Sequence, residues 1–163
     1  MSALDQRSMH IEFIDDVFIL TPFREWGPHR IQAAVGPISL VRTQGHRERL
    51  AAVIKDILNS DSLDSSDDRE KFIKIRALEK KDLIEKHLPA FYTDKLTKYD
   101  KATKCFAVRA KIPGFVDLCP MTTHKGGQKV PRDKGLNLTI NENASDDEWK
   151  SAIQTAIDRC VFE

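Results

Sequence analysis

The sequence predicts a single α+β domain, in which three to four helices cover a mixed or antiparallel sheet of short strands. The chain has 163 residues, which is an ordinary size for one domain. Runs rich in β-branched and aromatic residues lie near both ends of the chain, and helical patterns lie between and after them. Strands grouped in this way are typical of an α+β fold. We expect the domain to span residues 9–163, preceded by a flexible leader or tail over residues 1–8.

The first strands are expected within the first quarter of the chain. Residues 11–20 are typical of one bent strand, or of two short strands hinged at Asp15-Asp16. Residues 31–35 and 38–41 are expected to form two further short strands, because the turn signal Gly36-Pro37 separates them.

Helical periodicity begins after Gly45. Five apolar residues share one stripe of a helix, namely Leu50, Val53, Ile54, Ile57 and Leu58. A second helix is expected to begin at an Asp67 or Asp68 N-cap and to run through Ile75 and Leu78. Pro89 interrupts this pattern, which favours a separate short helix through Phe91, Leu96 and Tyr99.

Strand patterns return after Lys101. Residues 105–109 and 115–119 are predicted strands joined at Pro113-Gly114, and residues 136–140 form a third. Ser145, with Glu148 three residues later, matches a capping box. The last helix is expected to run from there to about Arg159, with Trp149, Ala152, Ile153, Ala156, Ile157 and Cys160 on its apolar face.

Composition excludes several classes of protein. The formal net charge is +1, so nothing marks the whole chain as a nucleic-acid binder. The 3 cysteines are widely spaced, and we expect them to be reduced and buried. The 5 histidines form no paired spacing, so no metal site and no cofactor are expected. The chain contains no apolar run long enough for a membrane span or signal peptide, which favours a cytoplasmic location.

One polar segment could hold a small ligand. The stretch from Thr122 to Lys134 combines hydroxyls, a Gly-Gly pair and basic side chains, which are groups that suit a phosphate. An enzyme built on it would require Thr122, Thr123, His124 and Lys125 to converge on one pocket. Cys119 with His124 could also form a nucleophile and base. A solvated loop between two strands is the simpler interpretation.

The charge is unevenly distributed. Residues 1–70 hold 8 basic and 12 acidic side chains, whereas residues 71–163 hold 18 and 13. Clustered carboxylates can steer a basic protein partner, although such a run is more often only a solvated loop. Trp26, in a predicted turn, is a candidate interface anchor. The acidic cluster consists of Asp61, Asp64, Asp67, Asp68 and Glu70.

Four segments of the C-terminal half together form a known family pattern. They are residues 91–99, 104–108, Pro120-Met121-Thr122-Thr123-His124-Lys125 and the closing helix 152–160. On these segments the chain resembles the contact-dependent growth inhibition immunity proteins, which are small cytosolic bacterial proteins that protect a cell from the toxins of its neighbours. The resemblance covers roughly residues 70–163. The family pattern has an apolar residue and a tryptophan after the Pro/Thr/His segment, where this chain has Gly126-Gly127-Gln128.

The resemblance implies a binding function without catalysis. Such a protein grips the C-terminal toxin domain of its cognate secreted effector and blocks the toxin's active site. These toxins are commonly nucleases with cationic substrate clefts, which an acidic patch would complement. The acidic cluster and Trp26 are therefore the predicted toxin-binding residues, and the loop from Thr122 to Lys134 remains the alternative, as a ligand or phosphate site of an enzyme.

Overall fold

The computed structural model describes residues 7–26, 31–34, 38–59, 69–110 and 113–163. The strands are β1 (Arg7–Ile14), β2 (Val17–Trp26), β3 (Ile31–Ala34), β4 (Ser39–Arg42), β5 (Lys104–Ala110), β6 (Phe115–Thr123), β7 (Lys129–Pro131), β8 (Leu138–Asn141) and β9 (Val161–Phe162). The helices are α1 (Glu48–Leu58), α2 (Arg69–His87), α3 (Thr97–Ala102) and α4 (Asp146–Arg159), with 3-10 turns at Pro89–Phe91 and Lys134–Leu136. None of the described helices is both long and apolar enough to cross a membrane.

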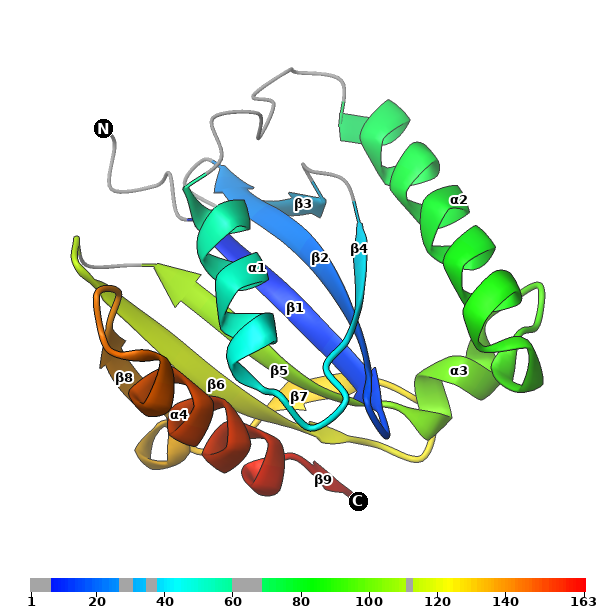
Figure 1. The fold of residues 1–163 in the computed structure, drawn as a ribbon. Helices are drawn as coiled ribbons and strands as arrows, with labels where there is room; N and C mark the ends of the chain where they lie inside the picture. Colours follow the sequence, from blue (N-terminus) through cyan, green and yellow to red (C-terminus); the bar gives the residue numbers. More distant parts are fainter. Residues whose placement is uncertain (1–6, 27–30, 35–37, 60–68, 111–112) are drawn as a thin grey trace.

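One sheet joins all of these strands. Its central path runs β3-β2-β1-β5-β6-β7, with β4 also paired to β2, and with β8 and β9 also paired to β6. Neighbouring strands are antiparallel except for the short parallel pairing of β9 with β6. The predicted α+β fold with a largely antiparallel sheet is therefore confirmed (Figure 1).

The hinge at Asp15-Asp16 is the turn of a hairpin. Ile14 lies opposite Val17, so β1 and β2 are two strands joined by this two-residue connection. Asp15 takes a positive φ of 50°, which aspartate tolerates better than most residues. Strand β1 begins at Arg7, two residues before the expected start of the domain, because Arg7 and Ser8 pair with both β2 and β5.

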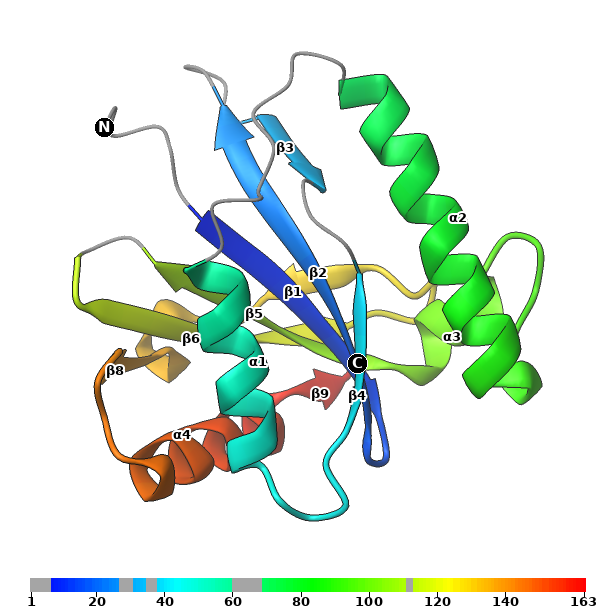
Figure 2. The same cartoon turned by 45° about the horizontal axis from the view of Figure 1, so that its top comes forward.

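Helices α1 and α4 cover one face of the sheet and enclose the main core. The predicted stripe of α1 is confirmed, since Leu50, Ile54 and Leu58 are buried against the sheet. Ser145 caps α4 by accepting a hydrogen bond from the Glu148 N–H at 3.2 Å, as the sequence predicts. Figures 1 and 2 show α1 and α4 together on this face, with α2 and α3 apart from them. The sheet supplies Met9, Ile11, Phe13, Phe18, Leu20, Phe106, Val108, Val116, Leu118 and Ile140.

Helices α2 and α3 contact the opposite face. Side chains alternate between the two faces of a strand, so Ile19 points away from the main core and packs with Ile84 and Tyr99 instead. The expected helix through Ile75 and Leu78 is present, but these two side chains are 38% and 62% exposed. In the C-terminal half of α2, by contrast, Ile84 is completely buried.

Candidate functional site

Most of the predicted toxin-binding residues lie outside the described structure. Asp61, Asp64, Asp67 and Asp68 fall in the range that is not described, and Glu70 belongs to the first turn of α2. Trp26 was predicted to lie in a turn, which is wrong. It is the last residue of β2, opposite Ile31 of β3, because the extended pairing of β2 continues through residues 23–26.

The structure does not bring the alternative ligand residues together. Thr122 and Thr123 are the last two residues of β6, so their side chains point to opposite faces. Thr123 is 1% exposed, and its hydroxyl donates to the Thr103 carbonyl at 2.9 Å. His124 pairs with the Glu163 carboxylate, and Lys125 is exposed. The expected loop is thus partly a β6–β7 hairpin, since the backbone N–H groups of residues 124 and 127 close its turn.

The Gly-Gly pair serves this turn rather than an open anion cradle. Gly127 has a φ of +92°, which favours glycine, and a Cβ atom there would lie 2.8 Å from the Cβ of Asp100. The Gly127 N–H donates to the His124 carbonyl at 2.8 Å. Lys129 Nζ then donates to the carbonyls of Asp100 and Gly127, at 2.5 and 3.1 Å. These contacts fix the hairpin against α3.

The three cysteines are reduced and buried, as predicted. Cys119 packs with Cys105, Ala107 and Met121 on the sheet, while the His124 ring is engaged by Glu163. Burial raises the pKa of the Cys105 thiol well above its usual range, and burial raises the pKa of Cys160 to about 11. These environments favour inert thiols over a nucleophile.

We therefore expect 5,5′-dithiobis(2-nitrobenzoate) to react slowly with all three thiols of the native protein at pH 8. A thiol with a pKa of about 11 is only about one part in a thousand thiolate at that pH. After denaturation in guanidinium, all three thiols should react fully with the reagent. Modification of one native thiol within the mixing time, mapped by mass spectrometry to Cys119, would support the nucleophile interpretation instead.

A buried polar cluster between the sheet and α2 escaped the sequence analysis. Glu12 of β1 is 8% exposed, and its carboxylate accepts a hydrogen bond from Lys80 Nζ of α2. Lys80 Nζ also lies 5.2 Å from the centroid of the Tyr99 ring. Burial alone would lower the pKa of Lys80, but the charge of Glu12 and their hydrogen bond raise it. Lys80 thus stays protonated, and its ion pair with Glu12 fixes α2 to the centre of the sheet.

His10 lies on the same face as Glu12, and its ring packs on Phe23 with centroids 4.5 Å apart. Burial lowers the pKa of His10, and the positive charges of Arg109 and Lys80 lower it further, against the opposing effect of Glu12. Protonation of His10 therefore opposes folding.

The free energy of unfolding should consequently decrease as the pH is lowered through the range in which His10 titrates. Below about pH 6.5 the His10 imidazole takes up a proton in the unfolded chain, whereas burial opposes this protonation in the folded chain. His10→Phe keeps the ring contact and removes the titration, so it should lose less stability than the wild type between about pH 7.5 and about pH 5.5. Urea unfolding curves at both pH values check this, and equal losses would contradict it.

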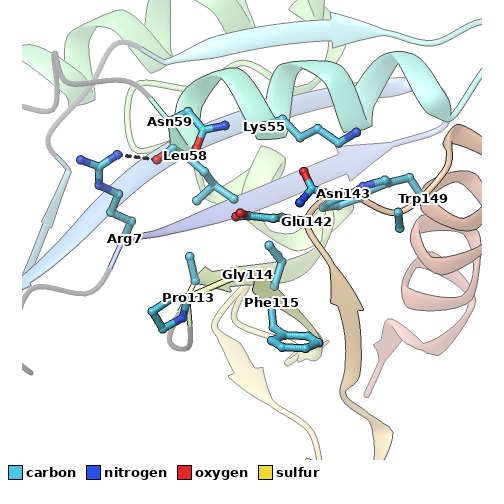
Figure 3. A pocket seen from close by; sticks show the side chains of 13 residues that line it. Arg7, Lys55, Leu58, Asn59, Pro113, Gly114, Phe115, Glu142, Asn143 and Trp149 are labelled. Atoms are coloured by element: carbon cyan, nitrogen blue, oxygen red, sulfur yellow. Dashed lines mark hydrogen bonds between the residues drawn. The ribbon is translucent and has the colours of Figure 1, made fainter.

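A cavity of about 550 Å³ opens between the C-terminal end of α1 and the connection from β5 to β6 (Figure 3). Arg7 Nη1 donates to the Leu58 carbonyl at 2.5 Å on one side of it. Trp149 of α4 lies on the other side, under the Lys55 ammonium. The other lining residues are Asn59, Ala110, Pro113, Gly114, Phe115, Val116, Glu142, Asn143 and Ala144.

The fold is shared with solved structures at low sequence identity. A protein of unknown function from Neisseria meningitidis matches with a TM-score of 0.72 and 15% identity, over 98% of this chain and 98% of that one. A chain of the CdiA-CT/CdiI toxin and immunity complex from Yersinia pseudotuberculosis matches with a TM-score of 0.67 and 13% identity, over 95% of this chain and 97% of that one. Neither a protein-family model nor a curated protein sequence matches the chain.

Proposed function

We propose that this protein is an immunity protein, which binds and neutralises the C-terminal toxin domain of a contact-dependent growth inhibition effector in the cytoplasm without catalysis. The observation that supports this proposal most is the fold shared with a chain of a toxin and immunity complex over 95% of the length. The sequence resemblance of residues 70–163 to immunity proteins points the same way. The toxin is proposed to be a nuclease.

The placement of the polar loop also favours binding over catalysis. Thr123 and His124 make hydrogen bonds within the fold, so one hydroxyl and the imidazole that the enzyme alternative needs are engaged. The cysteine next to this loop is buried. A protein that acts by binding needs none of these groups to be free.

The acidic cluster is proposed to steer the toxin domain into contact. A nuclease presents a cationic cleft, and carboxylates opposite it raise the rate of association. A complex with a nanomolar dissociation constant requires about −12 kcal/mol, which steering alone does not supply. Buried anchors are therefore also required, and Trp26 is the proposed first anchor.

Reversing the charge of the five acidic residues to lysine should lower the association rate with the toxin domain at least about tenfold at low salt. The difference should shrink at high salt, because salt screens exposed charges. Stopped-flow measurements across salt concentrations test this. The five residues are Asp61, Asp64, Asp67, Asp68 and Glu70.

Two controls separate steering from folding. Substitution of the same residues by asparagine and glutamine keeps helix-capping groups near the start of α2 and should give an intermediate rate. Reversal of five exposed carboxylates elsewhere should have a smaller effect. If reversing the charge of the acidic cluster leaves the association rate and the affinity for the toxin domain unchanged, the steering proposal is contradicted. The control set is Asp56, Asp82, Glu85, Asp94 and Asp158.

Binding itself is tested by co-purification with the toxin domain encoded immediately upstream of this chain, inactivated so that it can be expressed. The tagged chain is expected to retain the untagged toxin domain through size-exclusion chromatography as one complex. A toxin domain from an unrelated system is the control. Elution of the cognate toxin domain as a separate species would contradict the proposed function.

A further inference from the structure

The cavity of Figure 3 holds a buried hydrogen-bond donor that the fold leaves unused. Trp149 is 0% exposed, and its indole Nε1 has no hydrogen-bond partner among the residues that the structure describes. Figure 3 shows this nitrogen on the edge of the ring that faces Asn143. A buried N–H that has lost water without gaining an acceptor destabilises the fold, and an acceptor entering the cavity would relieve this.

The charge around this donor favours an anion as that acceptor. Lys55 Nζ lies 5.3 Å from the centroid of the Trp149 ring, so a cation and an N–H donor share one end of the cavity. Among the described lining residues, Arg7 adds a second cation and Glu142 a carboxylate. Figure 3 shows the Glu142 carboxylate directed away from Lys55 and Trp149, toward the side of Arg7.

The rest of the cavity is suited to an apolar body. Leu58 and Val116 are 9% and 2% exposed, and both line it. Phe115 is also a lining residue, but its ring points away from Leu58 and Trp149 in Figure 3 and is 44% exposed. A volume of about 550 Å³ lies in the range of small-molecule sites, which combine apolar walls with a few placed polar groups.

We propose that this cavity binds a small carboxylic acid with an apolar body. The carboxylate accepts hydrogen bonds from Trp149 Nε1 and Lys55 Nζ, and the apolar body lies against Leu58 and Val116. Lys55 lies over the indole ring, so its side chain must shift to meet the carboxylate and to open the path to the indole N–H. None of the described lining residues is a proposed toxin-binding residue, and the test below does not use the toxin domain, so the inference stands or falls independently of the proposed function.

Phenylacetate is a suitable probe, and phenylacetamide is its uncharged counterpart. The protein has 2 tryptophans, so its ¹H–¹⁵N spectrum contains two indole signals, and Trp149→Phe assigns the one from Trp149. Phenylacetate is expected to shift the Trp149 indole proton downfield in a saturable manner. The affinity for phenylacetamide should be at least about tenfold lower, because charge-assisted hydrogen bonds are the stronger ones.

A matched pair of variants tests the role of the cation. Lys55→Met keeps the length of the side chain and should weaken phenylacetate binding about tenfold, whereas Lys86→Met on the exposed surface of α2 should leave it unchanged. Circular dichroism confirms that both variants are folded. The inference is overturned if phenylacetate gives no saturable shift up to about 50 mM, if both probes bind equally, or if Lys55→Met binds as the wild type does.

Discussion

Replacing Trp149 with alanine is expected to lower the free energy of unfolding by about 3–5 kcal/mol. The indole is fully buried between α4, α1 and the sheet, and it is the largest completely buried side chain among the residues that the structure describes. Its removal leaves a void next to an existing cavity and weakens the packing of both helices. Urea unfolding followed by circular dichroism measures the loss.

Two variants calibrate this result. Trp149→Phe keeps most of the apolar contact and removes the N–H that has no partner among the described residues, so it should cost only about 1–2 kcal/mol. Leu78→Ala, at a side chain that is 62% exposed on α2, should change stability by less than about 0.5 kcal/mol. A loss in Trp149→Ala as small as that in Leu78→Ala would contradict the described packing of α4.

Replacing Lys80 with methionine should be the second most damaging change, at about 2–4 kcal/mol. The Glu12 carboxylate would remain on the sheet beneath α2 without its cation, and a buried charge without a partner is strongly unfavourable. We place the effect toward the lower end of measured cases because 21% of the Lys80 side chain remains exposed.

The double variant Glu12→Gln with Lys80→Met identifies the cause. Removing both charges should recover at least half of the loss, since the uncompensated carboxylate is then absent. Lys86→Met serves as an exposed control on the same helix. If the double variant is less stable than Lys80→Met, the pair contributes by packing rather than by charge.

The sequence pattern predicted those helices and strands in which buried side chains recur at the period of the element. The apolar stripe of α1 and the N-cap of α4 could both be predicted from the sequence, because each helix has one apolar face that packs against the sheet. The hairpin at Asp15-Asp16 was likewise one of two stated alternatives. Helix α2 has no comparable stripe, so the sequence could not show that Ile84 is buried while Leu78 is exposed.

Long-range contacts account for what the sequence could not predict. Glu12 and Lys80 are 68 positions apart, and only the packing of α2 on the sheet brings them together. The Gly-Gly pair suggested an anion cradle because its packing partner, Asp100, belongs to a different element. The cavity at Trp149 likewise draws on residues from both ends of the chain, which no local motif could have united.

The most direct measurement of the proposed function is the survival of cells that express the active toxin domain encoded immediately upstream of this chain. Co-expression of the chain is expected to restore colony numbers to those of cells without toxin, and it should give no protection against a toxin domain from an unrelated system. Cell death at the same rate with and without the chain, at verified expression of folded protein, would contradict the account.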